Sequence, residues 1–266
     1  VQAPGDTPGT LAAVHPPPDT AKETITPQPH TVDRSEVSNI AKRDDPHGYS
    51  KGGVGKSLVT MATVDYLQER GESVLLIESD TSNPDVWKAY KESTETELIN
   101  LDEADGWIQL VNLCDSKPDS VVVINTAARN NKGVSAYGET LNSTLEELKR
   151  KLVTLWVINR QRDSLELLKE YMDAIPNADV HVVRNGHFGE EKKFELYNGS
   201  KLRTAVEERG GKSVTFPDMA DRVSDDIYSK RMSIAVALKE LPIGNRAELT
   251  RWRNEAKKVL EAVVHE

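Results

Sequence analysis

Short apolar runs alternate along this chain with stretches in which larger apolar residues recur at helical spacing. Five runs, at 73–77, 119–124, 153–158, 180–183 and 213–216, are rich in valine, leucine and isoleucine without strict alternation. Such runs are typical of strands buried on both faces of a sheet. Between them, helical spacing joins Leu58, Met61, Val64 and Leu67, and later Leu165, Leu168 and Met172. This order predicts an α/β fold with a doubly wound, mostly parallel sheet.

Residues with special backbone preferences mark the ends of the predicted helices. Gly71 stands where the first helix needs a C-terminal cap, because glycine adopts the left-handed conformation of such caps. Asp163 or Ser164 is the candidate N-cap of the helix that follows 153–158. A last helix is predicted over 249–260.

The amino-terminal stretch differs in composition from the rest of the chain. It is rich in proline and threonine, includes three consecutive prolines at 16–18, and holds few large apolar residues. Such a sequence buries too little apolar surface to offset the entropy lost on ordering. We therefore expect a disordered extension over 1–47 and one folded domain over 48–266. The alternative for the extension is a polyproline segment that binds a partner.

Residues 51–57 read Lys-Gly-Gly-Val-Gly-Lys-Ser, which is typical of a phosphate-binding loop. Consecutive glycines let the backbone curl around an anion so that its N–H groups point at the phosphates. Lys56 supplies a positive charge, and the Ser57 hydroxyl is a ligand for Mg²⁺. The general pattern would have glycine where Ser50 stands, but the extra Lys51 defines a known variant of the loop. The loop predicts binding of a nucleoside triphosphate with magnesium.

With both lysines, the loop resembles the deviant Walker A motif of the ParA/MinD-like P-loop ATPases. The resemblance implies a SIMIBI-type P-loop NTPase fold that binds ATP and Mg²⁺ and forms a homodimer when ATP is bound. It assigns Lys56 to the chain's own nucleotide and Lys51 to the phosphates of the partner's nucleotide, both as catalytic residues. The expected nucleotide contacts come from Gly52, Gly53, Val54, Gly55, Lys56, Ser57 and Leu58.

An acidic segment follows the run at 73–77, where relatives carry an Asp-x-Asp switch. Glu78 stands in place of the first aspartate, and Asp80 matches the second. Carboxylates at the carboxyl end of a parallel strand face the ligand crevice. The resemblance therefore assigns Asp80 to the catalytic water and to Mg²⁺, with Glu78 as a supporting carboxylate. The alternative is a solvated acidic loop.

The run at 119–124 ends in Asn125, where relatives carry the Walker B aspartate. An amide oxygen can accept a hydrogen bond from a magnesium-bound water, but the amide adds no negative charge. We expect Asn125 to replace the aspartate at the metal site, with weaker magnesium binding and slow hydrolysis. A protein that binds nucleotide without hydrolysing it is the opposing interpretation.

Contacts with the nucleotide base are implied by the resemblance at two later positions. Asn185 follows the run at 180–183, and Pro217 and Asp218 follow the run at 213–216. Between them, the loop at 186–200 carries Phe188, Phe194 and Tyr197 among charged residues. Its length makes it a candidate for partner contact.

Composition restricts the classes of protein to which this chain can belong. The chain has 266 residues, a net charge of −9 and a single cysteine, Cys114, so it has no internal disulfide framework. It lacks an apolar stretch long enough to cross a bilayer and a secretory signal, so we expect a cytoplasmic protein without a membrane partner. Basic residues recur in the last 45 positions, where interleaved acids argue for a solvated face. The partners considered are DNA and a DNA-bound adaptor protein.

A strand should lead into a phosphate-binding loop, yet 39–49 contains no apolar or β-branched run. That strand would lie at the centre of the sheet, and its loss would leave neighbouring strand edges unpaired. Two explanations are open. Either 37–41 serves as a poor strand, or the residues before Tyr49 derive from a truncated or frame-shifted reading of the gene, which we favour.

The function that the resemblance implies is that of a slowly hydrolysing ATPase that acts as a dimeric switch in plasmid partition, stability or mobilisation. Two alternatives are a nucleotide-dependent scaffold that does not hydrolyse ATP, and an ATP-dependent ligase of the same P-loop class.

Overall fold

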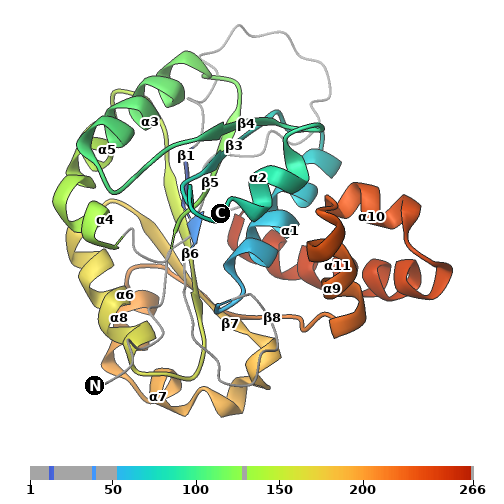
Figure 1. Ribbon diagram of the computed structural model, residues 1–266. Helices are drawn as coiled ribbons and strands as arrows, with labels where there is room; N and C mark the ends of the chain where they lie inside the picture. Colours follow the sequence, from blue (N-terminus) through green and yellow to red (C-terminus); the bar gives the residue numbers. More distant parts are fainter. Residues whose placement is uncertain (1–11, 15–37, 40–52, 128–130, 265–266) are drawn as a thin grey trace, which may run out of the picture.

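A computed structural model of the chain describes residues 12–14, 38–39, 53–127 and 131–264 (Figure 1). Its sheet has eight strands in these residues, seven of them in the order β4-β3-β5-β1-β6-β7-β8, while β2 pairs with β5 off this path. All pairings are parallel except those of β1, so the predicted doubly wound, mostly parallel α/β fold is confirmed. The strands are β1 Ala12–Val14, β2 Ser38–Asn39, β3 Val74–Glu78, β4 Glu95–Leu98, β5 Val121–Asn125, β6 Leu152–Ile158, β7 Asp179–Asn185 and β8 Ser213–Phe216.

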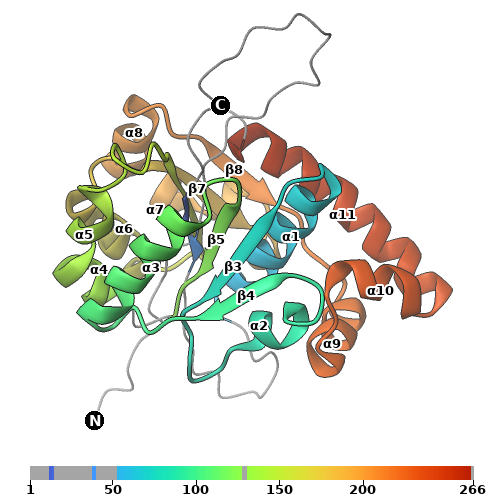
Figure 2. The ribbon, with the colours of Figure 1, turned by 90° about the horizontal axis from the view of Figure 1, so that it is seen from above.

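Two layers of helices enclose the sheet (Figure 2). One layer contains α1 Lys56–Glu69, α2 Asp85–Tyr90, α9 Asp221–Lys230, α10 Ile234–Glu240 and α11 Ile243–Val264. The other contains α3 Ala104–Ser116, α4 Asn131–Tyr137, α5 Glu139–Asn142, α6 Asp163–Ala174, α7 Glu195–Asn198 and α8 Lys201–Glu208, with the 3₁₀ turns η1 Gly186–Phe188 and η2 Glu191–Lys193 between β7 and α7. Each layer forms its own apolar cluster against one face of the sheet. Among the described residues, no helix is both long enough and apolar enough to cross a bilayer.

The five apolar runs all form strands, and every residue of β3, β5 and β6 is buried. Strand β4 was not predicted, because its sequence Glu-Thr-Glu-Leu has no apolar run. It lies at the edge of the sheet and, among the strands that the structure describes, pairs only with β3. An edge strand with exposed charges resists pairing with other chains, which explains why a strand here can be polar.

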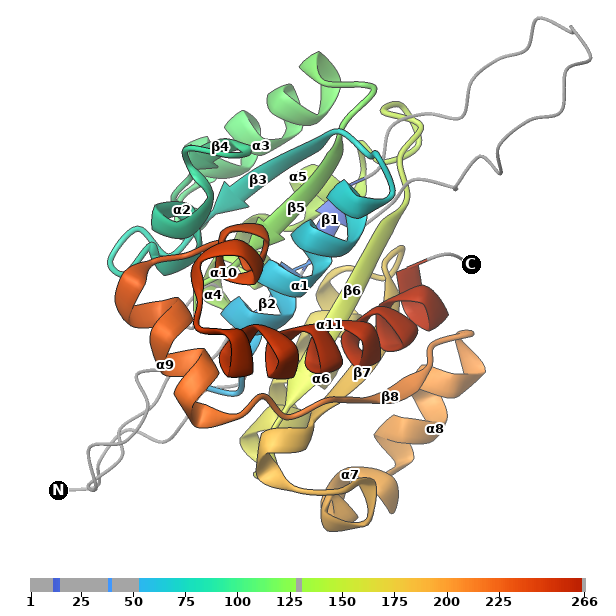
Figure 3. The same cartoon turned by 90° about the vertical axis from the view of Figure 1, so that its right-hand side faces the viewer.

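Helix α1 is buried on more sides than its sequence indicates. The residues from Val59 to Leu67 are all buried, whereas Leu58, which we expected on the apolar stripe, is only half-buried. Met61, Val64 and Leu67 of the predicted stripe are buried, and burial extends beyond the stripe because α1 is covered by the sheet on one side and by α11 on the other (Figure 3). The predicted cap is confirmed, since Gly71 has φ +82° and donates its N–H to the Gln68 carbonyl.

The N-cap of α6 differs from both candidates. Arg162 occupies that position, and both Asp163 and Ser164 lie inside the helix. Ser164 is buried and donates its hydroxyl to Oδ1 of Asn159 at 2.8 Å. Its hydroxyl is therefore used to fix the turn between β6 and α6 rather than to cap the helix.

The centre of the sheet is filled by residues from the predicted extension. Strand β1 runs antiparallel between β5 and β6, and β2 runs parallel to β5 opposite Ile124 and Asn125. Ser38–Asn39 lies within the segment considered as a poor first strand. The rest of 1–47 is outside the described residues, so its disorder and the origin of the residues before Tyr49 stay predictions.

The last helix, α11, packs against α1 and β8. Trp252 of α11 is fully buried, packs edge-to-face on Phe216 of β8, and donates its indole N–H to the Pro217 carbonyl at 2.9 Å. Next to it, Arg253 donates to both carboxylate oxygens of Asp65 on α1, at 2.6 and 3.2 Å. Helix α11 therefore connects α1 to the loop after β8.

Trp252→Ala should destabilise the fold by about 3–5 kcal/mol, because it removes a large buried side chain and leaves the Pro217 carbonyl without its donor. Arg251→Ala is the matched control: Arg251 is on the exposed face of the same helix, where it pairs with Glu248 and Glu255. Urea unfolding followed by circular dichroism measures both. Equal midpoints for the two variants would contradict the anchoring role of Trp252.

Candidate functional site

The phosphate-binding loop leads directly into α1. Gly53, Val54 and Gly55 form the described part of the loop, and Lys56 and Ser57 begin the helix. Gly55 is the N-cap residue and has φ +96°, a left-handed conformation that residues with a Cβ seldom adopt. The unpaired N–H groups at the start of a helix favour an anion. Lys51 and Gly52 lie outside the described residues.

Lys56 is buried beside two carboxylates. Burial lowers the pKa of its ammonium well below the usual value, and Asp80 and then Glu78 act in the opposite direction. The structure therefore brings Lys56 together with Glu78 and Asp80, which lie more than twenty positions after it in the sequence. A positive side chain at the start of α1 suits a phosphate ligand, so these residues fit the expected nucleotide.

Asn185, at the end of β7, holds the phosphate-binding loop from the other side. Its amide donates to the Val54 carbonyl at 2.8 Å, and its oxygen accepts the His187 N–H at 3.0 Å. A Cβ on Gly55 would lie only 2.3 Å from the Asn185 amide nitrogen. Glycine is therefore needed at position 55 both for its φ and for this close approach. The base contact expected of Asn185 stays a prediction.

The segments expected around the base lie next to each other. A Cβ on Gly186 would meet the Phe216 carbonyl at 2.5 Å, so the turn after β7 packs tightly on the loop after β8. His187 approaches Asp218, with 3.2 Å between Nδ1 and Oδ1. Asn185, Pro217 and Asp218 thus share one side of the phosphate-binding loop.

Asp80 organises the loop that follows β3. Its Oδ1 accepts the backbone N–H groups of Ser82 and Asn83 at 3.2 and 3.1 Å, and the Ser82 hydroxyl at 2.5 Å. Residues 81–83 are exposed, as in the alternative of a solvated acidic loop. Asp80 itself is half-buried and interacts electrostatically with Lys56, so its carboxylate belongs to the site.

Glu78 and Asn125 face each other at the ends of β3 and β5. The parallel register pairs the two residues, and the Asn125 amide donates to both Glu78 oxygens, at 2.9 and 3.0 Å. The Thr60 hydroxyl of α1 donates to Oδ1 of Asn125 at 3.0 Å, and the Asp80 N–H donates to Oε1 of Glu78 at 3.0 Å. Thr60 was not predicted from the sequence, although it lies one helical turn after Lys56.

Magnesium is expected at Ser57, Asp80 and Asn125. Ser57 is half-buried in the first turn of α1. The described residues contain no cluster of three or more His, Cys, Asp or Glu side chains that could hold a metal alone. Mg²⁺ is usually bound through one or two protein ligands together with substrate phosphates. The three assignments stay predictions.

Residues 49–185 match the CobQ/CobB/MinD/ParA nucleotide-binding domain, which covers more than half of the chain. The chain belongs to this family. The predicted resemblance to the ParA/MinD-like ATPases is therefore confirmed.

Two individual proteins are similar to this chain. The chain is 97% identical over 219 residues to Protein MobD of Acidithiobacillus ferrooxidans, a match that covers 82% of this chain and 96% of that protein. A solved nucleotide-binding protein from Archaeoglobus fulgidus, in complex with ADP, aligns with 72% of this chain and 86% of its own, at 13% identity and a TM-score of 0.38. A structural likeness this weak has no bearing on function.

The loop at 186–200 packs against the second helical layer. Phe194 and Tyr197 are buried in the apolar cluster of the second helical layer. Contact between this loop and a partner stays a prediction. Arg184 of β7 fixes the loop through Oε1 of Glu191 at 2.5 Å and Oδ1 of Asn198 at 3.0 Å. These two aromatic residues therefore belong to the apolar core, at and within the short helix α7.

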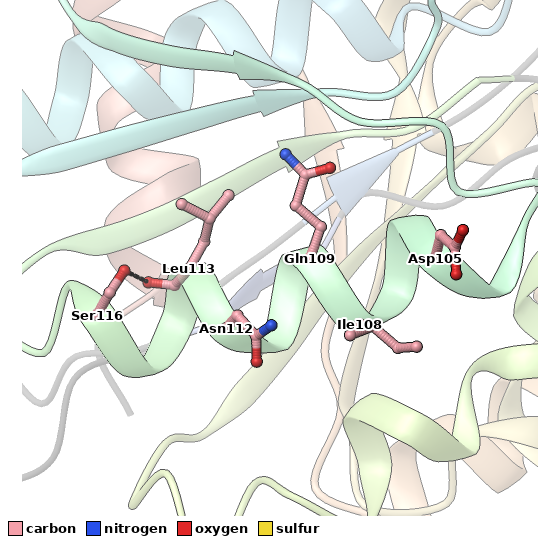
Figure 4. Close-up of a pocket in the computed structure, with 6 residues that line it drawn as sticks. All are labelled: Asp105, Ile108, Gln109, Asn112, Leu113 and Ser116. Carbon is pink, nitrogen blue, oxygen red and sulfur yellow. Dashed lines mark hydrogen bonds between the residues drawn. The ribbon is translucent and has the colours of Figure 1, made fainter.

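A shallow pocket lies on α3 and is separate from the nucleotide site (Figure 4). All its lining residues come from that one helix: Asp105, Ile108, Gln109, Asn112, Leu113 and Ser116. The phosphate-binding loop lies on the opposite helical layer (Figure 2). The pocket contributes no residue to the candidate site.

Gly55→Ala should abolish nucleotide binding, because the new Cβ both disfavours φ +96° and collides with Asn185. Gly71→Ala is the control, since Gly71 has φ +82° but a Cβ at that position would meet nothing within 4 Å. Titration with a fluorescent ATP analogue measures both variants. We expect Gly55→Ala together with Asn185→Ala to recover part of the binding. Normal affinity of Gly55→Ala would contradict the close approach.

Folding stability should depend on the ionisation of Glu78. Burial raises the pKa of Glu78 from about 4.5 to about 7, while hydrogen bonds from Asp80 and Asn125 oppose the shift. The folded state keeps this proton to higher pH than the unfolded state does. The stabilising contribution is therefore complete below pH 4.5 and is lost as pH rises through about 7, with a maximum on the order of 3 kcal/mol.

Glu78→Gln cannot ionise, so the stability of the native protein should fall relative to this variant between pH 5 and 8. Urea unfolding at several pH values measures the difference. Glu97→Gln, a substitution of an exposed glutamate on β4, should leave the pH dependence unchanged. Parallel curves for the native protein and Glu78→Gln would show that the burial of Glu78 does not govern this dependence.

Proposed function

We propose that the protein is an ATP-dependent molecular switch: it binds ATP with Mg²⁺, hydrolyses it slowly, and forms a nucleotide-dependent homodimer. The observation that carries this proposal is the buried Lys56 at the start of α1, behind a left-handed Gly55 and beside Asp80. This arrangement suits a triphosphate and its metal. The family supports nucleotide binding, and the dimer and the turnover are the proposal's own additions.

Each part of the site has a chemical task in this function. The N–H groups at the start of α1 and the Lys56 ammonium hold phosphate oxygens, which carry more negative charge as the terminal phosphoryl group leaves. Ser57 and Asp80 would hold Mg²⁺, which neutralises phosphate charge when bound. Asp80 orients the attacking water. Lys51 would reach the phosphates of the partner subunit's nucleotide and so link dimerisation to ATP.

Hydrolysis should be slow because Asn125 brings no charge of its own and its amide is already used. Both ends of that side chain are bonded, to Thr60 and to Glu78. A long-lived ATP state is what a switch requires. The same observation favours a second candidate, a nucleotide-dependent scaffold that does not hydrolyse ATP. Steady-state phosphate release above that of Lys56→Ala would exclude the scaffold.

The biological process proposed is plasmid mobilisation, because the chain is nearly identical to Protein MobD over most of its length. Partition and stability functions use the same kind of switch and are the alternatives within the proposal. The switch would act in the cytoplasm.

The partner proposed is a DNA-bound adaptor protein rather than DNA itself. Many basic residues near the carboxyl end are neutralised within the chain: Lys230 by Asp226, Arg251 by Glu248 and Glu255, and Arg253 and Lys257 by Glu69. Paired cations offer less charge to phosphates of a nucleic acid. A DNA-bound adaptor protein would recruit the switch to DNA without requiring a basic DNA-binding surface on this chain.

Light scattering coupled to size-exclusion chromatography tests the dimer. With ATP and Mg²⁺ the mass should double, and with ADP or no nucleotide it should not. Lys51→Ala should stay monomeric while still binding ATP, because Lys51 would serve the partner's nucleotide. Lys192→Ala, which removes an exposed lysine paired with Glu190, should behave as the native protein. A Lys51→Ala dimer in ATP would refute this assignment, and a native monomer in ATP would refute the switch.

A further inference from the structure

His187 lies in the turn that follows β7, beside the phosphate-binding loop. Its side chain is 52% exposed, and the side chain of Asp218, which it approaches from the opposite loop, is 55% exposed. Asn185, which contacts the phosphate-binding loop directly, is only 8% exposed. A ligand bound at this side of the site can therefore reach His187 and Asp218 more readily than Asn185.

Three contacts hold the His187 turn and its ring in place. The backbone N–H of His187 donates to Oδ1 of Asn185 at 3.0 Å, and Nδ1 of the ring lies 3.2 Å from Oδ1 of Asp218. Phe188 packs edge-to-face on the ring, with 5.4 Å between the two centroids and 82° between the planes. An exposed side chain that is ordered in advance loses less entropy when a ligand binds. The imidazole ring is therefore preorganised.

The loop that carries Asp218 is anchored as well. Trp252 donates its indole N–H to the Pro217 carbonyl at 2.9 Å. The turn at Gly186 packs on this loop so closely that a Cβ at Gly186 would lie 3.2 Å from the Asp218 backbone nitrogen. The contact between His187 and Asp218 thus joins two loops that are already fixed to each other.

Asn185 serves the phosphate-binding loop. Its amide donates to the Val54 carbonyl at 2.8 Å, and its oxygen accepts the His187 N–H. A Cβ on Gly55 would lie 2.3 Å from the amide nitrogen, so the space between Gly55 and Asn185 is filled. The contacts of this side chain therefore shape the loop and the turn after β7.

The two sides of the site differ in charge, and this difference orients a nucleotide. Lys56 lies with Asp80 and Glu78 toward β3, whereas β7 and β8 lie on the other side of α1 (Figure 3). Terminal phosphates and a divalent cation belong beside the lysine and the carboxylates. The base is attached at the other end of the phosphate chain, so it is directed toward β7 and β8.

We propose that the nucleotide base stacks on the His187 ring, that Asp218 orients this ring, and that Asn185 holds the phosphate-binding loop rather than the base. The assignment rests on the proposed nucleotide-binding function and deepens it by naming the residue that contacts the base. An imidazole ring offers a flat face to a planar base, and such stacking does not depend on which base is bound. His187 is thus a binding residue, and Asp218 is a positioning residue.

Two ligands separate contact with the base from contact with the phosphates: ATP, and inorganic triphosphate, which has neither ribose nor base. Isothermal titration calorimetry with Mg²⁺ measures both. His187→Ala should weaken ATP binding about tenfold, through the loss of one stacking contact, and leave binding of inorganic triphosphate unchanged. His187→Phe keeps a ring and should bind ATP within about threefold of the native protein. Lys192→Ala, which removes an exposed lysine of the same loop, is the control.

Variants of the two neighbours test how the tasks are divided. Asp218→Ala should weaken ATP binding less than His187→Ala does. It should have no further effect when position 187 is already alanine, because residues that act through one contact are not additive. Asn185→Ala should weaken binding of ATP and of inorganic triphosphate alike, because it changes the phosphate-binding loop. Thermal unfolding followed by circular dichroism verifies that each variant is folded.

The outcomes distinguish the stacking role of His187 from the proposed function. Equal ATP affinity of the native protein and His187→Ala would overturn the stacking role and leave the function intact. An equal loss of inorganic triphosphate binding would also overturn it, because His187 would then act on the phosphates or their loop. If inorganic triphosphate binds the native protein too weakly to measure, the ring variant decides, since equal losses in His187→Ala and His187→Phe would exclude stacking. Native protein that does not bind ATP would refute the proposed function and the stacking role with it.

Discussion

The burial of Lys56 at the start of α1 is the constraint on which the site depends. An ammonium taken out of water loses its hydration, which is tolerated only where nearby acceptors or negative charges replace it. The carboxyl ends of the strands provide that environment, with Asp80 and Glu78 both within electrostatic reach. Glu78 in turn depends on Asn125, and Asn125 on Thr60, which belongs to the same helix as Lys56. The Lys56 ammonium, the Glu78 carboxylate, the Asn125 amide and the Thr60 hydroxyl therefore form one connected group of polar interactions at the start of α1.

Segments far apart in the sequence fix the shape of the phosphate-binding loop. Asn185 contributes its amide to the Val54 carbonyl across 131 positions of the chain, and Trp252 holds the loop after β8 that packs on the turn after Asn185. These contacts explain why a short glycine motif is not a site by itself. Its geometry also depends on contacts with β7, β8 and α11.

The sequence predicted the buried strands because short runs of valine and isoleucine in a polar chain are typical of strands buried on both faces. The phosphate-binding loop was predictable because the local chemistry of glycine and lysine determines what it can bind. Partners across the fold were not predictable in the same way. The pairing of Glu78 with Asn125 depends on the strand register, and the polar edge strand β4 shows no apolar pattern. The burial of Phe194 and Tyr197 was not predictable either, because it depends on how a short loop folds back, which no periodicity reveals.

The three-residue strand β1 divides the sheet into two longer blocks, β4-β3-β5 and β6-β7-β8. Glu78 and Asn125 come from the first block, and Asn185 comes from the second. The nucleotide site therefore receives residues from both blocks of the sheet. The apolar cluster of α1 and α11 includes residues of β3, β5, β6, β7 and β8, so this single helical layer packs against both blocks and joins the strands that supply the two sides of the site.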